Sequence, residues 1–493
     1  MAEAVIEERQ LLKSLRWYDG FVIALCNPGF LLGSLGFSVG ALGGWGAMCL
    51  WGISATIGLL SNWIYSETAA MFPEQSGGIS LYAHEGWRRY FSLVGPVATF
   101  GYWIGWSVVL SIFGKIIGDL IEAKWFPGQA ANVYFSIGSN HLGLPHMIAI
   151  GVIIGVWVFN VLGVKPSLWV GYVTGALLMV PLAVFIFVPF ITGDYHSSNM
   201  TWTINGQWGG LRLAFVWLFI MAWSAYGIEV CASFAPEYHD TKRDTALALR
   251  SAAMFSLLVY VLLPLGVTGT TGVDYINKQG AEGQFYVGVF DKLVGSGAAS
   301  VMLIFLLGSL VLSMNSSTAD GGRALYGISK AGMTIKELGV LNRFHVPARA
   351  MTVDLLVNIA LVLFISSNLA ILYMSNIGYV FAHVAAITGF LLLRKDRPDW
   401  PRPIKVSRIW IPIAVVIASA NAVFLVVGAG SPTLNGYGTW TDFGIGVGIL
   451  AGSVFLYIYR RVVQDKQPVH LREETPKLPP DVVAPAAVGQ PVT

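Results

Sequence analysis

Glu229 is the side chain of this sequence best suited to chemistry, because it lies inside a long apolar run close to a glycine. The run contains the segment Trp223-Ser224-Ala225-Tyr226-Gly227-Ile228-Glu229. Ionisable groups in membrane segments are costly and mark functional sites by default, and a carboxylate that loses its water near unwound backbone gains proton affinity. We therefore predict a proton-binding role for Glu229. The alternative is structural: the carboxylate would accept hydrogen bonds from N–H groups freed by a broken helix.

A second unusual segment runs from Cys26 to Gly36 and reads CNPGFLLGSLG. Pro28 removes a backbone donor, and three glycines lower the cost of leaving helical geometry. Unwound backbone at membrane depth is tolerated where it lines a cavity or is buried in protein. Freed N–H groups at the start of the following half-helix would form a site for a carboxylate, and Ser34 would add a hydroxyl.

Composition indicates that membrane helices must position these residues. Of 493 residues, 55% are hydrophobic and only 12% are charged, with a mean hydropathy of +0.65, whereas about a quarter of a soluble domain is charged. A net charge of +3 is too small to predict nucleic-acid binding. Cys26, Cys49 and Cys231 all lie in apolar runs, so we expect no disulfide, metal site or cofactor. We expect no cleavable signal peptide.

Twelve apolar runs follow one another, most of them near the roughly 20 residues that one membrane crossing requires. In chain order they are Phe21 to Gly44, Trp45 to Met71, Phe91 to Leu120, Leu144 to Gly163, Ser167 to Thr192, Leu211 to Ala235, Ser251 to Gly272, Ser296 to Asp320, Met351 to Ser366, Leu369 to Leu393, Ile409 to Gly430 and Phe443 to Tyr459. We therefore predict an all-α integral membrane protein with twelve transmembrane helices.

The basic residues predict how these spans are oriented. One side of the membrane would hold most of them, including the dense stretch at 394–408, and the other side would hold only Lys124, Arg212, Lys278 and Lys292. Because basic loops stay inside, we predict that both termini are cytoplasmic and that the protein lies in the plasma (inner) membrane.

Three regions follow from this arrangement. Residues 1–18 would form a cytoplasmic N-terminal segment and residues 19–463 the transmembrane domain. Residues 464–493 are rich in Pro, Val and Ala without helical periodicity, which predicts a disordered cytoplasmic tail.

The two glycine-containing segments fall in the first and sixth spans, five spans apart. Broken helices at corresponding positions of two halves indicate a transporter built from inverted repeats, with its site at the breaks. The alternative is that these glycines only let helices pack closely, as small residues often do in membranes.

Five motifs resemble the amino acid–polyamine–organocation (APC) superfamily permeases, in the same order over roughly residues 15–460. They are Gly29-Phe30-Leu31-Leu32-Gly33-Ser34, the segment from Pro73 to Tyr82, the segment from Ala235 to Arg243, Arg323-Ala324-Leu325-Tyr326 with Lys330-Ala331-Gly332-Met333, and Arg402-Pro403-Ile404-Lys405-Val406. The resemblance implies a LeuT-type 5+5 inverted-repeat fold with discontinuous helices 1 and 6 and substrate bound at their breaks.

The resemblance also implies the site residues. The Gly-Ser-Gly backbone that holds a substrate carboxylate in relatives maps to Gly33 and Ser34, and Leu35 stands where the family usually has its last glycine. Trp223 falls where arginine/agmatine antiporters place a substrate-covering tryptophan, and Glu229 falls at their proton-responsive glutamate. The complete predicted substrate-binding set is Gly29, Phe30, Gly33, Ser34, Leu35, Trp106, Trp223, Tyr226 and Gly227.

An apolar, aromatic cavity favours a neutral or apolar amino acid as cargo, carried by a proton-coupled symporter or exchanger. The alternative cargo is a polyamine, choline-like molecule or other organic amine, held by Glu229 and by cation–π contacts. We find no catalytic constellation and expect no enzyme activity. A channel or a transporter-like sensor is a less favoured interpretation.

The coupling ion stays open between proton and sodium. Ser313 and the stretch 315–318 could supply oxygens to sodium, but serine on membrane helices also bonds to its own backbone. Span five has no mid-depth lysine of the kind that replaces sodium in some proton-coupled relatives. His383 is a further possible proton carrier, with a packing role as the alternative, and Asp320 is expected to pair locally with a basic residue.

Overall fold

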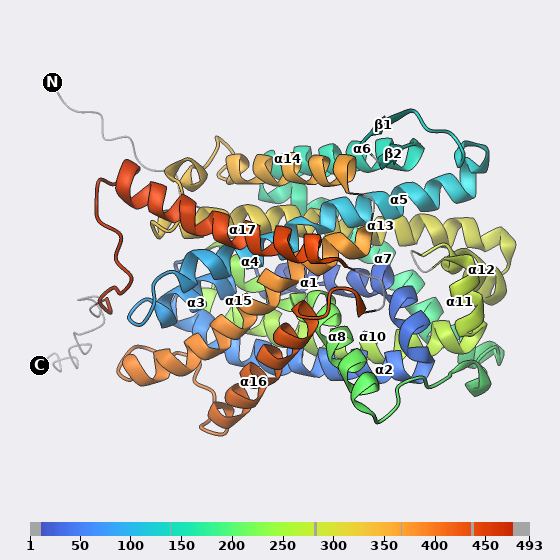
Figure 1. The fold of residues 1–493 in the computed structure, drawn as a ribbon, viewed down its shortest axis with the longest axis horizontal. Helices are drawn as coiled ribbons and strands as arrows, with labels where there is room; N and C mark the ends of the chain where they lie inside the picture. Colours follow the sequence, from blue (N-terminus) through green and yellow to red (C-terminus); the bar gives the residue numbers. More distant parts are fainter. Residues whose placement is uncertain (1–10, 139, 281–282, 366, 435–437, 477–493) are drawn as a thin grey trace, which may run out of the picture.

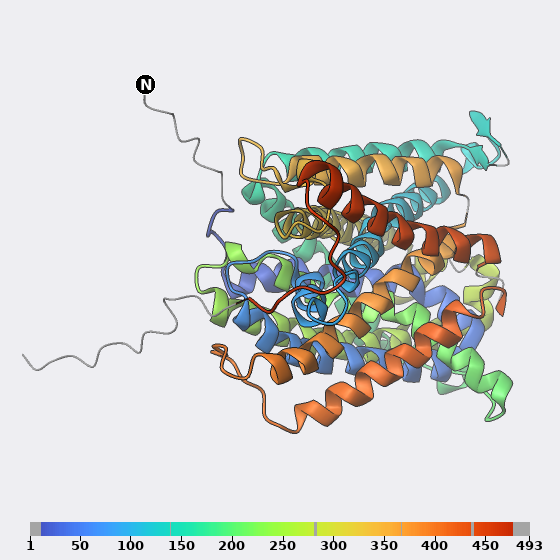
Figure 2. The same ribbon diagram turned by 60° about the vertical axis from the view of Figure 1, so that its left-hand side comes forward.

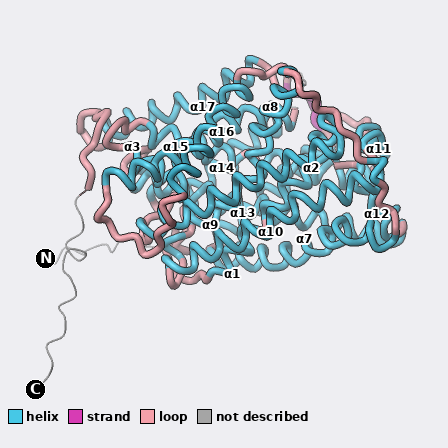
Figure 3. The backbone as a smooth tube through the Cα atoms, turned by 90° about the horizontal axis from the view of Figure 1, so that it is seen from below, coloured by secondary structure: helices cyan, strands magenta, loops and turns pink. Residues whose placement is uncertain are grey.

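The computed structural model describes residues 11–476 except 139, 281–282, 366 and 435–437 (Figure 1). Most of these residues are helical, and many of the long helices run along the length of the molecule with loops gathered towards its two ends (Figures 1 and 3). The α-helices are α1 (Trp17–Ala24), α2 (Cys26–Met71), α3 (Gly78–Trp87), α4 (Val94–Ser107), α5 (Val109–Trp125), α6 (Leu144–Val161), α7 (Val164–Thr192), α8 (Trp208–Ala225), α9 (Val230–Ser233), α10 (Thr241–Thr271), α11 (Val273–Gln279), α12 (Phe285–Val294), α13 (Ser296–Lys330), α14 (Ala348–Phe364), α15 (Asn368–Asp396), α16 (Trp410–Ala429) and α17 (Trp440–Tyr459).

Short elements connect the helices. Strands β1 (Phe135–Ile137) and β2 (Asn140–Leu142) form one antiparallel pair in which Phe135 lies opposite Leu142. The short helices are η1 (Pro127–Gln129), η2 (Ser197–Asn199), η3 (Gly227–Glu229), η4 (Ala235–Glu237), η5 (Lys336–Gly339) and the π-turn η7 (Arg460–Gln464).

Ten helices in the described part of the chain are long and apolar enough to cross a membrane. The apolar window of Trp208–Ser233 is 89% buried inside the protein, whereas that of Trp440–Gln464 is only 17% buried. The first lies in the centre and the second at the periphery, where its apolar side chains, such as Phe455, are exposed. Exposed apolar surface on such helices suits lipid contact, so the prediction of a helical, multi-pass membrane protein is confirmed.

Gly43 divides the 46-residue helix α2 into two parts. Its φ of 73° and ψ of 170° are not helical, and glycine reaches this region without steric cost. A Cβ at this position would lie 2.5 Å from the carbonyl oxygen of Thr201, so the kink also requires a residue without a side chain. The predicted boundary between the first two spans, at Gly44 and Trp45, falls next to this kink.

One end of the molecule carries buried ion pairs between segments far apart in the sequence. Glu67 near the end of α2 accepts from Arg394 in the last turn of α15 and from Arg402 in the α15–α16 connection. Glu85 on α3 pairs with Arg88 and Arg397. In Figure 1, α3 lies at the left end, opposite α11 and α12, and Figure 2 brings this end of the molecule forward.

The first and last described segments of the chain also pack at the end of the molecule that carries Glu67 and Glu85. The backbone of Leu15 pairs with that of Tyr238 in a parallel bridge. In the tail, Leu471 accepts a hydrogen bond from the Ser92 backbone at 2.9 Å, and Glu473 pairs with Arg88 at 2.7 Å. Of the tail predicted to be disordered from residue 464, residues 477–493 lie outside the described residues.

Candidate functional site

The sixth span is interrupted beside Glu229. Helix α8 ends at Ala225, Tyr226 follows, and Gly227–Glu229 form the 3₁₀ turn η3 before α9 begins. A Cβ on Gly227 would lie 2.5 Å from Asn27 Oδ1 and 3.2 Å from the Trp106 ring. Only glycine lets the chain approach α2 and α4 this closely, and the interruption lies where the sequence predicts it.

The first span differs from the prediction. Residues 26–36 are helical, and Leu25, which joins α1 to α2, also keeps right-handed helical φ and ψ of −61° and −13°. The prediction that Cys26–Gly36 unwinds is therefore wrong. Pro28 falls in the first turn of α2, where backbone N–H groups have no intrahelical partner and a missing donor costs little.

The glycines of this segment serve close packing. A Cβ on Gly29 would lie 2.4 Å from Ser313 Oγ, and one on Gly33 would lie 2.6 Å from the Phe113 ring. The Ser34 hydroxyl donates to the Phe30 carbonyl oxygen at 3.0 Å, within its own helix. Because Gly33, Ser34 and Leu35 are helical, their N–H groups are not free as the carboxylate site requires. For these glycines the packing alternative is the correct one.

The predicted aromatic residues meet between the first, third and sixth spans. Phe30 stacks on Trp223 with ring centroids 4.9 Å apart and planes 13° apart. The Trp106 ring lies 5.3 Å from Phe30, and Phe113 meets Phe30 edge-on at 5.4 Å. Trp223 Nε1 donates to the Gly105 carbonyl oxygen at 2.6 Å, which fixes the indole. Phe30, Trp106 and Trp223 thus form one buried cluster.

Glu229 lies next to this cluster and is fully buried. Its Oε1 accepts from the Tyr379 hydroxyl at 2.5 Å and from Trp106 Nε1 at 3.2 Å. His383 Nε2 lies 3.7 Å from the same oxygen. Among the described residues, Oε2 has no hydrogen-bond partner. The donors to this carboxylate are side chains of α4 and α15, and not the freed backbone groups of the structural alternative.

Two polar residues near η3 and the start of α2 were missed by the sequence analysis. Asn27 is fully buried, and within the described chain neither its Oδ1 nor its Nδ2 has a hydrogen-bond partner. The Tyr260 hydroxyl lies 2.9 and 2.6 Å from the carbonyl oxygens of Asn27 and Ser224, and so connects the two spans. An amide inside an apolar run was the signal available for Asn27; Tyr260 offers none.

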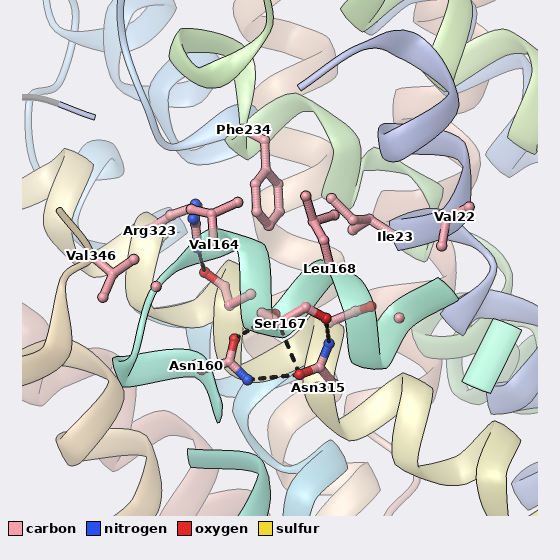
Figure 4. A pocket seen from close by; sticks show the side chains of 14 residues that line it. Val22, Ile23, Asn160, Val164, Ser167, Leu168, Phe234, Asn315, Arg323 and Val346 are labelled. Atoms are coloured by element: carbon pink, nitrogen blue, oxygen red, sulfur yellow. Dashed lines mark hydrogen bonds between the residues drawn. The ribbon is translucent and has the colours of Figure 1, made fainter. Parts of the chain in front are cut away.

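Two small cavities lie along α1 and α2. The one towards the C-terminal end of α2 is lined by Gly33, Ser34, Phe37 and Trp223. The other lies beside Val22 and Ile23 of α1 and is lined further by Asn160, Ser167, Leu168, Phe234, Asn315 and Arg323 (Figure 4).

The polar groups of the second cavity mostly bind one another. Asn160 Nδ2 donates to Asn315 Oδ1 at 2.9 Å, and Asn315 Nδ2 donates to the Ser167 carbonyl oxygen at 3.0 Å (Figure 4). Two hydroxyls considered for sodium are occupied as well. Ser313 Oγ lies 2.9 Å from the Cys26 carbonyl oxygen and 3.3 Å from that of Ser309 on its own helix, and Ser317 donates to the Ser313 carbonyl oxygen at 2.8 Å. These contacts agree with the alternative of backbone bonding.

A buried ion pair lies at the edge of this cavity, where Arg323 is one of the lining residues. Arg323 Nη2 lies 3.0 Å from Glu237 Oε2, a second contact joins Arg323 Nε to Oε1, and the guanidinium lies 4.2 Å over the Phe234 ring. Asp320 instead accepts from the Ser233 hydroxyl. Arg323, the basic residue three positions after Asp320, is engaged with Glu237.

Comparison with known proteins gives consistent matches. The family model described as "Amino acid permease" matches residues 15–455. Amino-acid permease RocE of Bacillus subtilis (strain 168) is 23% identical over 359 residues, 71% of this chain and 72% of the relative. Branched-chain amino acid permease BcaP of the same organism is 23% identical over 461 residues, covering 86% and 90%. A D-serine/D-alanine/glycine transporter of Escherichia coli O6:H1 is 23% identical over 329 residues, covering 62% and 66%.

Proposed function

The chain belongs to the amino acid permease family of the APC superfamily, and from this premise we propose that it is a secondary active transporter that moves a neutral or apolar amino acid by alternating access. The observation that carries the proposal is the interrupted sixth span, where Gly227 contacts the start of α2 and Glu229 lies under an aromatic cluster. The cavity lined by Gly33, Ser34 and Trp223 lies beside this cluster.

The proposed fold is the LeuT-type 5+5 inverted repeat with twelve spans. Two observations support twelve crossings from ten long helices. Gly43 divides α2 into two crossings, and α14, with 17 residues, adds another because it is one residue shorter than Leu144–Val161, the shortest of the ten. We propose that the face carrying Glu67 and Glu85 with their arginines is cytoplasmic, because basic segments remain inside. Both termini would then be cytoplasmic, in the plasma (inner) membrane.

The proposed binding site keeps the predicted residues, but Gly33, Ser34 and Leu35 no longer supply free backbone N–H donors, because they are helical. Phe30, Trp106 and Trp223 would form its apolar surface, and Asn27 beside Gly227 would offer an amide to the polar part of the cargo. Gly29, Tyr226 and Gly227 position these groups. We propose that Glu229 carries a coupled proton, in a symporter or an exchanger.

An organic amine is the second proposed cargo, and specific observations favour it. The helical geometry of residues 26–36 removes the expected carboxylate cradle. Within the described residues Glu229 Oε2 has no hydrogen-bond partner, while Oε1 accepts from Trp106 and Tyr379. A carboxylate among aromatic rings suits a cation.

A thermal-shift screen of purified protein separates the two cargo classes. A ligand at ~100 times its Kd adds roughly 2.7 kcal/mol to stability, which raises Tm by about 2–3 °C for an unfolding entropy of roughly 2.1 cal/mol/K per residue. Neutral amino acids should raise Tm. If only amines without a carboxylate raise it, the second cargo is correct.

Counterflow in proteoliposomes tests the transport mechanism. Saturable exchange of labelled substrate is expected, and Glu229→Gln should remove its pH dependence. Ohmic current instead of exchange would indicate a channel. Unchanged exchange with an unchanged pH profile in Glu229→Gln would refute the role of Glu229.

A further inference from the structure

His383 lies on α15 next to the interruption in the sixth span. Its Nε2 lies 3.7 Å from Glu229 Oε1, and both side chains are fully buried. Within the described part of the chain, neither His383 Nε2 nor Glu229 Oε2 has a hydrogen-bond partner. Buried polar atoms without partners are costly. An imidazole and a carboxylate this close stabilise each other best when they share one proton.

Tyr65 positions the imidazole from the other side. Its hydroxyl lies 2.9 Å from His383 Nδ1 and comes from α2, 318 residues earlier in the chain. When Nδ1–H donates to this hydroxyl, the neutral ring presents the lone pair of Nε2 to Glu229 and can take up a proton there. Tyr226 and Tyr379 pack edge-on against the ring at 5.1 and 4.8 Å and restrict its rotation. The contacts therefore hold the ring with one nitrogen towards the carboxylate.

The surroundings of the pair contain other titratable groups, and among the described residues they are acids, phenols and thiols. They are Cys26 and Tyr65 on α2, Tyr102 on α4, Tyr226 before η3, Cys231 on α9, Tyr260 on α10, Asp320 on α13 and Tyr379 on α15. His383 is the basic group within ion-pair distance of Glu229. It is therefore the neighbour best able to stabilise the carboxylate when the proton is on the imidazole.

We propose that Glu229 and His383 bind the coupling proton as one site, with Tyr65 as the residue that positions the imidazole. The proposal rests on the proposed transport function and extends it to a second proton-binding group. A proton on the imidazole leaves an ion pair between α15 and η3, and a proton on the carboxylate leaves a neutral pair. Proton binding and release would therefore change the contact between the interruption and α15.

Infrared titration of the purified protein tests the shared site without any transported substrate. The carbonyl stretch of protonated Glu229 is identified as the band that Glu229→Gln removes, and its intensity is followed against pH. In His383→Gln the carboxylate loses its cationic partner, so the midpoint should rise by about one pH unit or more, a tenfold change in proton affinity. Tyr65→Phe, which removes one hydroxyl, should move it in the same direction by less.

His84→Gln is the matched control. His84 is also buried and lies 4.0 Å from a glutamate, Glu85, but on α3. This substitution should leave the Glu229 band in place. An unchanged midpoint in folded His383→Gln would overturn the proposal, and if that variant does not fold, an unchanged midpoint in Tyr65→Phe would do so.

The pH profile of counterflow separates this inference from the proposed function. Exchange with the same profile in wild type and His383→Gln would refute the shared site and leave the transport function standing. Absence of any amino acid or amine exchange would refute the transport function, and the infrared midpoint would still decide whether the two residues share a proton.

Discussion

Replacing Arg323 with Gln should destabilise the protein through a single buried contact. The side chains of Arg323 and Glu237 are 1% and 0% exposed, and the guanidinium also covers Phe234. Removing one partner of a buried pair leaves an uncompensated charge, which costs about 3–5 kcal/mol. With roughly 2.1 cal/mol/K of unfolding entropy per residue over 493 residues, each kcal/mol shifts Tm by about 1 °C. The expected loss is therefore about 3–5 °C.

The assay is thermal unfolding in detergent, with Arg89→Gln as the matched control. Arg89 pairs with Asp396 at 3.3 Å, but its side chain is 59% exposed, and exposed pairs contribute at most about 1 kcal/mol. A double variant, Arg323→Gln with Glu237→Gln, should regain part of the lost stability because the unpaired charge is gone. Equal Tm values for Arg323→Gln and Arg89→Gln would refute this reasoning, as would a double variant less stable than the single one.

Two further perturbations follow from the same contacts. Gly227→Ala places a Cβ 2.5 Å from Asn27 Oδ1, so Tm should fall by about 1–3 °C and the exchange rate by about tenfold. Gly209→Ala, whose Cβ meets no atom within 4 Å, should change neither Tm nor exchange. Equal exchange rates in the two variants would contradict the close approach at Gly227. Burial raises the pKa of Glu85, but His84, Arg88 and Arg397 outweigh it and hold the pKa below 4.5. Because the folded pKa is depressed, this stabilisation is present above pH 4.5 and is lost as pH falls through the folded pKa. The Tm difference between wild type and Glu85→Gln should therefore shrink in acid, and a constant difference would contradict the assignment.

The membrane helices and the interruption at Gly227–Glu229 could be predicted from the sequence. An acid in an apolar run needs polar partners inside the protein, and a glycine beside it lowers the cost of leaving the helix. The prediction failed at Cys26–Gly36, where Pro28 and the glycines carry the same signal whether the chain unwinds or packs closely. The segment stays helical because Gly29 and Gly33 pack against Ser313 and Phe113. These contacts come from other helices, so the local sequence does not reveal them.

The polar partners of the site were beyond the sequence for a related reason. In the sequence, His383 cannot be distinguished from a packing histidine. Its contacts come from distant parts of the chain: the Tyr65 hydroxyl lies 2.9 Å from Nδ1, and Glu229 Oε1 lies 3.7 Å from Nε2. The pairing of Arg323 with Glu237 instead of Asp320 likewise depends on how α13 meets η4. Such contacts are set by tertiary packing.

A structure with the stabilising ligand from the thermal-shift screen tests the central claim most directly. We predict ligand density between α2 and the sixth-span turn, in contact with Asn27, Phe30, Trp223 and Gly227. Density at another place in the molecule, with this aromatic cluster still closed on itself, would contradict the account.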